Sequence, residues 1–409
     1  MEEFKSYKLS EVANLSTGFP FDGSKYSKSG IRVVRGDNVT IGSLRWDSDK
    51  LKCWSEPFSR AEEYSLRDGD IVIGMDGSRV GRNRAQISQS DLPLLLAQRV
   101  ACIRHNEKSV QDYLYYLIFS ERFVEYVKSV QTGTSIPHIS LRQIGDFEVH
   151  LPSIERQKSI CCVLKSLDEK IALNNRINHN LEEQAQAIYK SWFVDFEPFK
   201  AGKFVESELG LIPEGWRVGT LSELGDVVAG GTPSKAKPDY YTKNGIAWLT
   251  PKDLSVKCNK FTARGESDIT EDGYKNSSAK LMPRGSVLFS SRAPIGYISI
   301  AKGNICTNQG FKSVVPTYAG TAYVYYWLRE NTEAIESRAS GSTFKEASGS
   351  LMKSFPALVP NKSVLDFFEQ ELAPILNEQE ILEEEINHTE QIRDSLLPRL
   401  MSGEHVMNR

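Results

Sequence analysis

Two kinds of short segment carry residue types that could contact nucleic acid. One is a loop rich in glycine, serine and threonine, found at residues 131–138 and again at 340–345. Free backbone amides and short hydroxyl side chains of this kind donate hydrogen bonds to phosphate groups. The other segment is polar and contains arginine, at residues 74–84 and 290–296. Arginine and asparagine there could pair with guanine and adenine, although a solvated surface loop explains either segment equally well.

The candidate DNA contacts are the polar and basic side chains of these segments. Two further sites, at residues 35–38 and 250–253, are weaker candidates and are added to the set. The set consists of Arg35, Asn38, Ser78, Arg79, Arg82, Arg84, Thr134, Ser135, Lys252, Ser291, Arg292, Ser342, Thr343 and Lys345.

Catalytic signatures are missing. Gly202-Lys203-Phe204 lacks the glycine spacing and the hydroxyl residue of a phosphate-binding loop, and no G-x-G-x-x-G occurs. The adenine-methylating tetrapeptide Asn/Asp-Pro-Pro-Tyr is absent, and Pro238-Asp239 is not followed by the E-x-K of a nuclease. The six histidines and six cysteines have no metal-ligand spacing, so no metal site is expected. These absences predict a binding protein rather than an enzyme.

The bulk composition is that of an ordinary folded protein. The chain has 409 residues, is 40% hydrophobic and 25% charged, and carries a formal net charge of −3. This length suits two domains. The apolar runs are too short for a membrane span, and the N-terminus lacks the apolar core of a secretory signal, so we expect a cytoplasmic protein with no membrane partner. The slightly acidic balance neither supports nor excludes a nucleic-acid partner, because basic residues cluster locally.

The chain repeats itself with a period of about half its length. Seven blocks recur in the same order, at offsets between 208 and 216 residues. Leu9-Ser-Glu-Val matches Leu221-Ser-Glu-Leu, Gly69-Asp-Ile-Val-Ile matches Gly285-Ser-Val-Leu-Phe, and Ile177-Asn-His matches Ile386-Asn-His. Within each repeat, short apolar runs flanked by glycine and aspartate predict strands, and one helix is expected over residues 113–130 and over 322–337.

Each repeat ends in a segment with heptad spacing. In the first copy Ile160, Leu164 and Ile171 begin a series that runs to Trp192, and in the second a series runs from Leu365 to Leu400. Such spacing predicts long helices. One amphipathic helix could simply pack on its own domain, but two at equivalent places favour antiparallel pairing. Polar Asn174, Asn178 and Gln379 at seam positions would fix the register, and Pro374 should kink the second helix or lie near its start.

We therefore predict an α+β protein with an internal pseudo-two-fold repeat. It consists of two similar mixed α/β modules, at residues 1–152 and 203–361, separated by two long antiparallel coiled-coil helices at 153–199 and 362–402. The helices align closely between the copies whereas the loops differ, which suits a protein that reads two different half-sites.

Several stretches together resemble the specificity subunits of type I restriction–modification systems over essentially the whole chain. The residues that carry the resemblance are residues 9–13 and 221–225, 151–160, 248–254 and 340–345, and most strongly 181–196 with Pro213-Glu-Gly-Trp216. The first repeat departs from the family pattern at residues 35–38, where it has Arg-Gly-Asp-Asn and the second has Thr-Pro-Lys-Asp.

The resemblance implies two target recognition domains that each read one half of a split site in double-stranded DNA. The helices would space the domains and dock two modification (methyltransferase) subunits, with Leu181, Ile188, Trp192, Ile386 and Leu396 as candidate contacts. The chain itself would need no cofactor, because S-adenosylmethionine and ATP would be bound by the modification and restriction subunits. The alternative is a coiled-coil scaffold without sequence-specific DNA binding.

Overall fold

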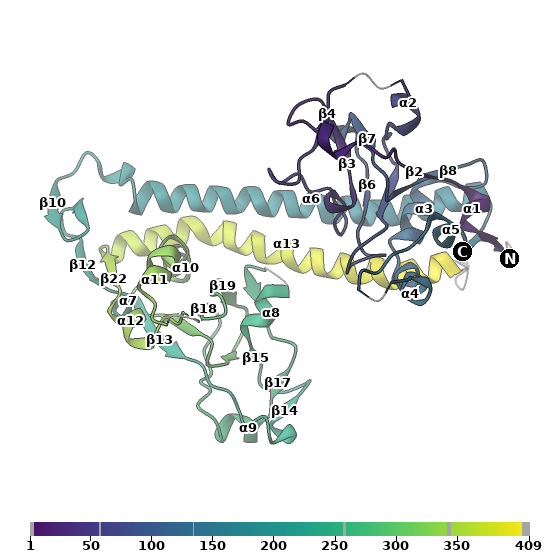
Figure 1. Ribbon diagram of the computed structural model, residues 1–409. Helices are drawn as coiled ribbons and strands as arrows, with labels where there is room; N and C mark the ends of the chain where they lie inside the picture. The colour runs from purple at the N-terminus through teal and green to yellow at the C-terminus, as the bar shows by residue number, and fades with distance from the viewer. Residues whose placement is uncertain (1–3, 57–58, 134, 257–258, 342–344, 403–409) are drawn as a thin grey trace. The chain divides into compact units, whose positions relative to one another are not determined.

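The computed structural model describes residues 4–56, 59–133, 135–256, 259–341 and 345–402 (Figure 1). The chain forms two compact units. Unit 1 consists of residues 1–170 and 389–409, and unit 2 of residues 171–388. Each unit therefore contains one repeat together with a stretch of each long helix.

Unit 1 is built on a four-stranded sheet in the order β2-β8-β5-β6 and a three-stranded sheet in the order β4-β3-β7, while β1 pairs with β9. Its strands are β1 (Lys5–Lys8), β2 (Ala13–Thr17), β3 (Ile31–Val34), β4 (Cys53–Trp54), β5 (Ile71–Gly74), β6 (Arg84–Gln86), β7 (Leu94–Leu96), β8 (Val100–His105) and β9 (Glu148–Leu151). Its short helices are α1 (Leu9–Val12), α2 (Ala61–Tyr64), α3 (Gln111–Ile118), α4 (Glu121–Val130) and α5 (Leu141–Gly145).

Unit 2 has a five-stranded sheet in the order β13-β21-β18-β19-β16 and four two-stranded pairings. Its strands are β10 (Phe204–Ser207), β11 (Gly210–Pro213), β12 (Arg217–Thr220), β13 (Gly225–Ala229), β14 (Tyr241–Thr242), β15 (Trp248–Leu249), β16 (Phe261–Thr262), β17 (Asp268–Ile269), β18 (Val287–Ser291), β19 (Ile295–Ala301), β20 (Cys306–Thr307), β21 (Lys312–Pro316) and β22 (Pro356–Val359). Its short helices are α7 (Leu221–Leu224), α8 (Pro251–Val256), α9 (Glu271–Lys275), α10 (Thr321–Glu330), α11 (Thr332–Arg338) and α12 (Gly349–Ser354).

The two repeats share their hydrogen bonds as well as their sequence blocks. The amide of Leu9 donates to the carbonyl of Phe147 over 2.8 Å, and the equivalent amide of Leu221 donates to Phe355 over 2.9 Å. Strand β3 runs parallel to β7, and its counterpart β15 runs parallel to β20. Gly69 and Gly285, which begin the turns into β5 and β18, have φ values of +83° and +84°. The predicted strands and the predicted duplication are therefore confirmed.

The single helix predicted after the sheet of each repeat is wrong in detail. In the first repeat it is divided into α3 and α4, because the Ser120 hydroxyl accepts a hydrogen bond from the amide of Phe123 and begins a new helix. In the second repeat α10 ends at Glu330 and α11 begins at Thr332. The residue types do not show either break, since both helices of each pair bury apolar side chains.

The long helices are α6 (Ile154–Phe193, 40 residues) and α13 (Lys362–Ser402, 41 residues). Pro374 lies inside α13, and the helix continues past it. Within unit 1, Arg393 of α13 pairs with Asp168 of α6 at 3.0 Å. Within unit 2, Asn174 of α6 donates to Glu385 of α13 at 3.0 Å. Further along α6 in unit 2, Glu182 accepts from Gln379 of α13 at 3.1 Å. The partner on α13 thus moves back from residue 385 to 379 as α6 advances from 174 to 182, which confirms the predicted antiparallel pairing in unit 2.

Candidate nucleic-acid interface

The two predicted DNA-contacting segments of the first repeat lie side by side in unit 1. Residue 75 follows β5, and its carbonyl accepts a hydrogen bond from the amide of Ile139 over 2.9 Å. The amide of Gly77 donates to the carbonyl of Pro137 over 3.0 Å. Asp76 and His138 add a side-chain pair across the two loops, with Nδ1 and Oδ1 2.5 Å apart. The two segments therefore form one surface, which we call the paired-loop surface of repeat 1.

Unit 2 contains the same arrangement. The amide of Ala347 donates to the carbonyl of Ser291 over 2.9 Å, at positions equivalent to Ile139 and Met75. Glu346 accepts from Arg292 at 3.3 Å and from Lys312 at 3.2 Å. The charges are exchanged relative to repeat 1, since the carboxylate now lies on the second loop and a cation on the first. The scaffold of this paired-loop surface of repeat 2 is thus shared, whereas its side chains differ.

Five predicted contacts are exposed at or near these surfaces. Ser78, Arg79 and Ser135 are exposed in unit 1, and Lys252 and Lys345 in unit 2. Arg82 is half-buried and holds Glu121 through two hydrogen bonds of 3.1 and 2.9 Å. Arg35 and Arg292 are also half-buried. Thr134, Ser342 and Thr343 lie outside the described residues.

Three predicted DNA contacts need correction because their side chains are buried. Asn38 is fully buried and donates to the carbonyls of Arg45 and Lys50 at 3.0 and 3.2 Å, while its oxygen accepts from the amide of Arg35. Its role is to close a turn. Ser291 is fully buried, and its hydroxyl donates to the carbonyl of Gly310.

Arg84 is the third correction. Its guanidinium donates to the carbonyls of Gly81 and Phe119 at 2.7 and 3.0 Å and lies 5.1 Å from the Phe119 ring. Burial lowers the pKa of this guanidinium to about 10, against an ordinary 12.5. These bonds hold the Arg84 side chain between β6 and the end of α3, so that it is not available to contact a base.

A cleft of about 670 Å³ opens in unit 2 beside the paired-loop surface of repeat 2. Lys252 and Arg292, both predicted contacts, line it. Its other donors and aromatic walls were not predicted from the sequence; they are Lys235, Tyr241, Trp248, Tyr297 and Asn308. Basic groups interleaved with aromatic faces suit nucleic acid. These residues come from five separate elements and loops, so their assembly depends on the fold.

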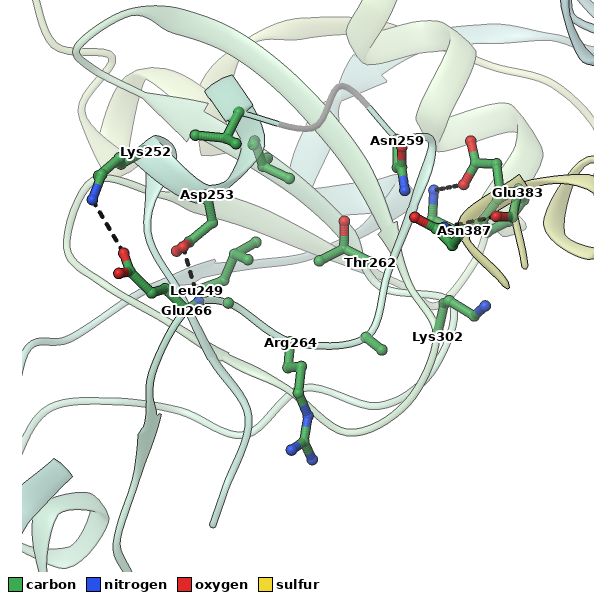
Figure 2. A pocket seen from close by; sticks show the side chains of 15 residues that line it. Leu249, Lys252, Asp253, Asn259, Thr262, Arg264, Glu266, Lys302, Glu383 and Asn387 are labelled. Atoms are coloured by element: carbon green, nitrogen blue, oxygen red, sulfur yellow. Dashed lines mark hydrogen bonds and ion pairs between the residues drawn. The ribbon is translucent and has the colours of Figure 1, made fainter. Parts of the chain in front are cut away.

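A second hollow, of about 570 Å³, is lined by residues of α8 and α13 (Figure 2). Lys252 pairs with Glu266 at 3.1 Å, and Asp253 accepts hydrogen bonds from the amides of Thr250 and Glu266. Figure 2 shows Arg264 pointing away from these groups, while Glu383 and Asn387 close the opposite side. Three cations, Lys252, Arg264 and Lys302, line this hollow together with three acids, Asp253, Glu266 and Glu383, so its charges balance.

A buried polar cluster ties the mixed module of unit 2 to the helices. The ammonium of Lys260 donates to Glu182 on α6, to Gln379 on α13 and to the hydroxyl of Tyr326, each over 2.7 Å. Arg329 also pairs with Glu182, and Glu383 accepts from the amides of residues 260 and 261. Lys260 is only 7% exposed. We call this set the Lys260 cluster.

Burial controls the charges in this cluster. It lowers the pKa of Lys260 to about 8, although Glu182 opposes the shift. It raises the pKa of Glu383. Burial also acts to raise the pKa of Glu182, but the ion pair and hydrogen bonds with Lys260 outweigh it, and the net shift is downward. The predicted seam residue Gln379 is part of this cluster, and the predicted Asn174 pairs with Glu385.

The residues predicted to bind partner subunits are half-buried. Ile188 and Trp192 pack against the core of unit 2, and Leu396 packs against the core of unit 1. Leu181 and Ile386 are also half-buried. Their freedom to meet another chain is therefore limited. More exposed apolar side chains lie elsewhere on the helices of unit 2, at Leu173, Ile177, Phe367 and Ile381.

The described part of the chain contains no cluster of three histidine, cysteine, aspartate or glutamate side chains that could hold a metal ion. Its five described cysteines are free thiols. Among the described residues, no helix is both long and apolar enough to cross a membrane.

Comparison with known proteins defines the class. A family model described as the type I restriction modification DNA specificity domain matches residues 1–183 and 213–391. The chain belongs to this family, and the two matches fall on the two repeats. It therefore takes part in DNA sequence recognition within a type I restriction–modification system, as a specificity subunit without catalytic activity. The sequence-based prediction of family and function is confirmed at this level.

Individual relatives agree with the family assignment. The HindI specificity subunit of Haemophilus influenzae is 24% identical, and the alignment covers 99% of this chain and all of the relative. The MjaIX specificity subunit of Methanocaldococcus jannaschii is 36% identical over 191 residues, which is 44% of either chain. The solved structure of a type I S subunit from M. genitalium covers the whole chain with a TM-score of 0.63 at 14% identity, a likeness of fold.

Proposed function

We propose that each repeat reads one half of a bipartite site in double-stranded DNA through its paired-loop surface. The carrying observation is that both repeats join the same two loops by an equivalent backbone hydrogen bond, Ile139 to Met75 and Ala347 to Ser291, yet present different side chains. A shared frame with different donors and acceptors is what two unlike half-sites require.

The helices suit the role of a spacer. Each of α6 and α13 has about 40 residues, and such a helix rises roughly 60 Å, more than the ~34 Å of one DNA turn. The Lys260 cluster fixes the mixed module of unit 2 to both helices, so a reading surface in that unit keeps its orientation to the spacer.

Two modification subunits would dock on this chain. The exposed apolar side chains Leu173, Ile177, Phe367 and Ile381 support a docking surface on the helices. S-adenosylmethionine would then be bound by the modification subunits and ATP by restriction subunits, so that this chain requires no cofactor of its own.

The salt dependence of binding tests the DNA contacts. We expect the assembled complex with a modification subunit to bind duplex DNA with an affinity that falls steeply as salt rises, since phosphate contacts release counterions. Lys345→Ala and Lys252→Ala should each reduce the slope of log affinity against log salt by about one. A flat salt dependence would instead favour the scaffold function.

A further inference from the structure

Arg99 occupies a position in unit 1 where folding alone favours glycine. It lies between β7 and β8 with φ of +67°, in the left-handed region that a side chain disfavours. The equivalent position in the second repeat is Gly310. Both carbonyls accept a hydrogen bond from the matching loop, from the amide of Met75 over 3.1 Å and from that of Ser291 over 2.7 Å. Arg99 therefore holds a strained left-handed backbone, whereas Gly310 in the second repeat does not adopt a positive φ.

The guanidinium of Arg99 is held at the paired-loop surface of repeat 1. Its NH1 donates to Oδ2 of Asp76 at 3.1 Å, and the other oxygen of Asp76 lies 2.5 Å from His138. The side chain is nevertheless 69% exposed. Among the described residues Asp76 is its one hydrogen-bonding partner, so most of its five N–H groups remain available. Ser78 and Ser135, on the two joined loops, are also exposed.

We propose that Arg99 reads a guanine in the first DNA half-site and that Asp76 is its positioning residue. The inference rests on the proposed function of the paired-loop surface. A guanidinium can donate two hydrogen bonds to O6 and N7 of guanine, which requires a fixed orientation. The backbone at Arg99 and the Asp76 carboxylate supply that orientation from two sides. Gly310 removes this donor from the second repeat, so the two half-sites differ in how they are read.

Arg99→Gly separates reading from folding, because glycine adopts this backbone conformation without strain. The complex of the full chain with a modification subunit would be used to select duplexes from a randomised DNA library. Wild type should return a split motif with a guanine in one half. Arg99→Gly should lose preference for that guanine by roughly 10-fold or more, keep the other half-site, and unfold at an unchanged or higher temperature. Asp76→Asn should weaken the same preference to a smaller extent.

Two outcomes would overturn the assignment. One is an unchanged motif in Arg99→Gly; the other is an equal loss of affinity for all sequences, which would identify a phosphate contact. Arg99→Lys sharpens the distinction, since lysine can replace arginine at phosphate but not in a bidentate pair. If wild type selects no split motif, the proposed function fails, and with it this role for Arg99.

Discussion

The Lys260 cluster allows a quantitative prediction. Replacing Lys260 by Met removes the donor shared by Glu182, Gln379 and Tyr326 and leaves these buried groups with fewer partners. Removing one member of a buried ion pair costs about 3–5 kcal/mol. Arg329 still pairs with Glu182 in the variant, so we expect a loss near the lower end, about 3 kcal/mol at pH 7. For a unit of this size that corresponds to a fall in Tm of about 6–12 °C.

The stability difference between wild type and Lys260→Met should also change with pH, in a direction set by the pKa of Lys260. The pKa of Lys260 is about 8 in the folded chain and 10.5 ordinarily. Between these values the unfolded chain binds a proton that the folded chain has released, so the free energy of unfolding rises with pH. The stability difference between wild type and Lys260→Met should therefore widen by about 1.4 kcal/mol per pH unit above pH 8.

Urea unfolding at pH 7, 8 and 9.5 measures both quantities. Lys252→Met is the matched control, because Lys252 is 73% exposed and its pair with Glu266 should contribute less than about 1 kcal/mol. A Lys260→Met protein as stable as wild type at pH 7 would refute the structural role of the cluster. A stability difference that stays constant from pH 8 to 9.5 would refute the account of its charge.

Three further predictions concern the turn, the reading surface and the helices. Asn38→Ala should destabilise unit 1 by about 2 kcal/mol, because the three hydrogen bonds of this buried side chain are lost. Thermal unfolding measures this loss. A change below about 0.5 kcal/mol would make Asn38 a candidate DNA contact again. Arg82→Ala should weaken DNA binding less than Arg79→Ala in gel-shift titrations, since Glu121 already holds Arg82, and the reverse order would contradict the assigned surface. Ile177→Glu should abolish co-purification with a modification subunit. Val205→Glu, equally exposed and apolar but on β10, should not; full recovery with Ile177→Glu would place the docking surface elsewhere.

The sequence predicted best those features that repeat locally. Heptad spacing from Ile160 to Trp192 and from Leu365 to Leu400 depends on the helix period alone, and the long helices follow it. The equivalent bonds made by Leu9 and Leu221 show that the matched blocks reflect one duplicated fold. The sequence also indicated residues that fix the register between the two long helices. Polar residues in an apolar seam need partners, and Asn174 has one in Glu385.

The candidate interface was harder to predict because exposure is a property of the fold. Arg79 and Arg84 lie five residues apart in one basic run, yet the first is exposed and the second is buried against Phe119. Lys260 has no local signal, since its partners come from α6, α10 and α13. Arg99 was missed because a left-handed backbone at arginine cannot be read from residue type.

The central claim is that this chain specifies a split DNA sequence. The most direct test is a long-read map of N6-methyladenine in a host that expresses the cognate modification subunit with and without this chain. We predict that methylation at one bipartite motif appears only when the chain is present, and that Arg99→Gly alters one half of that motif. The same methylation pattern with and without the chain would contradict the claim.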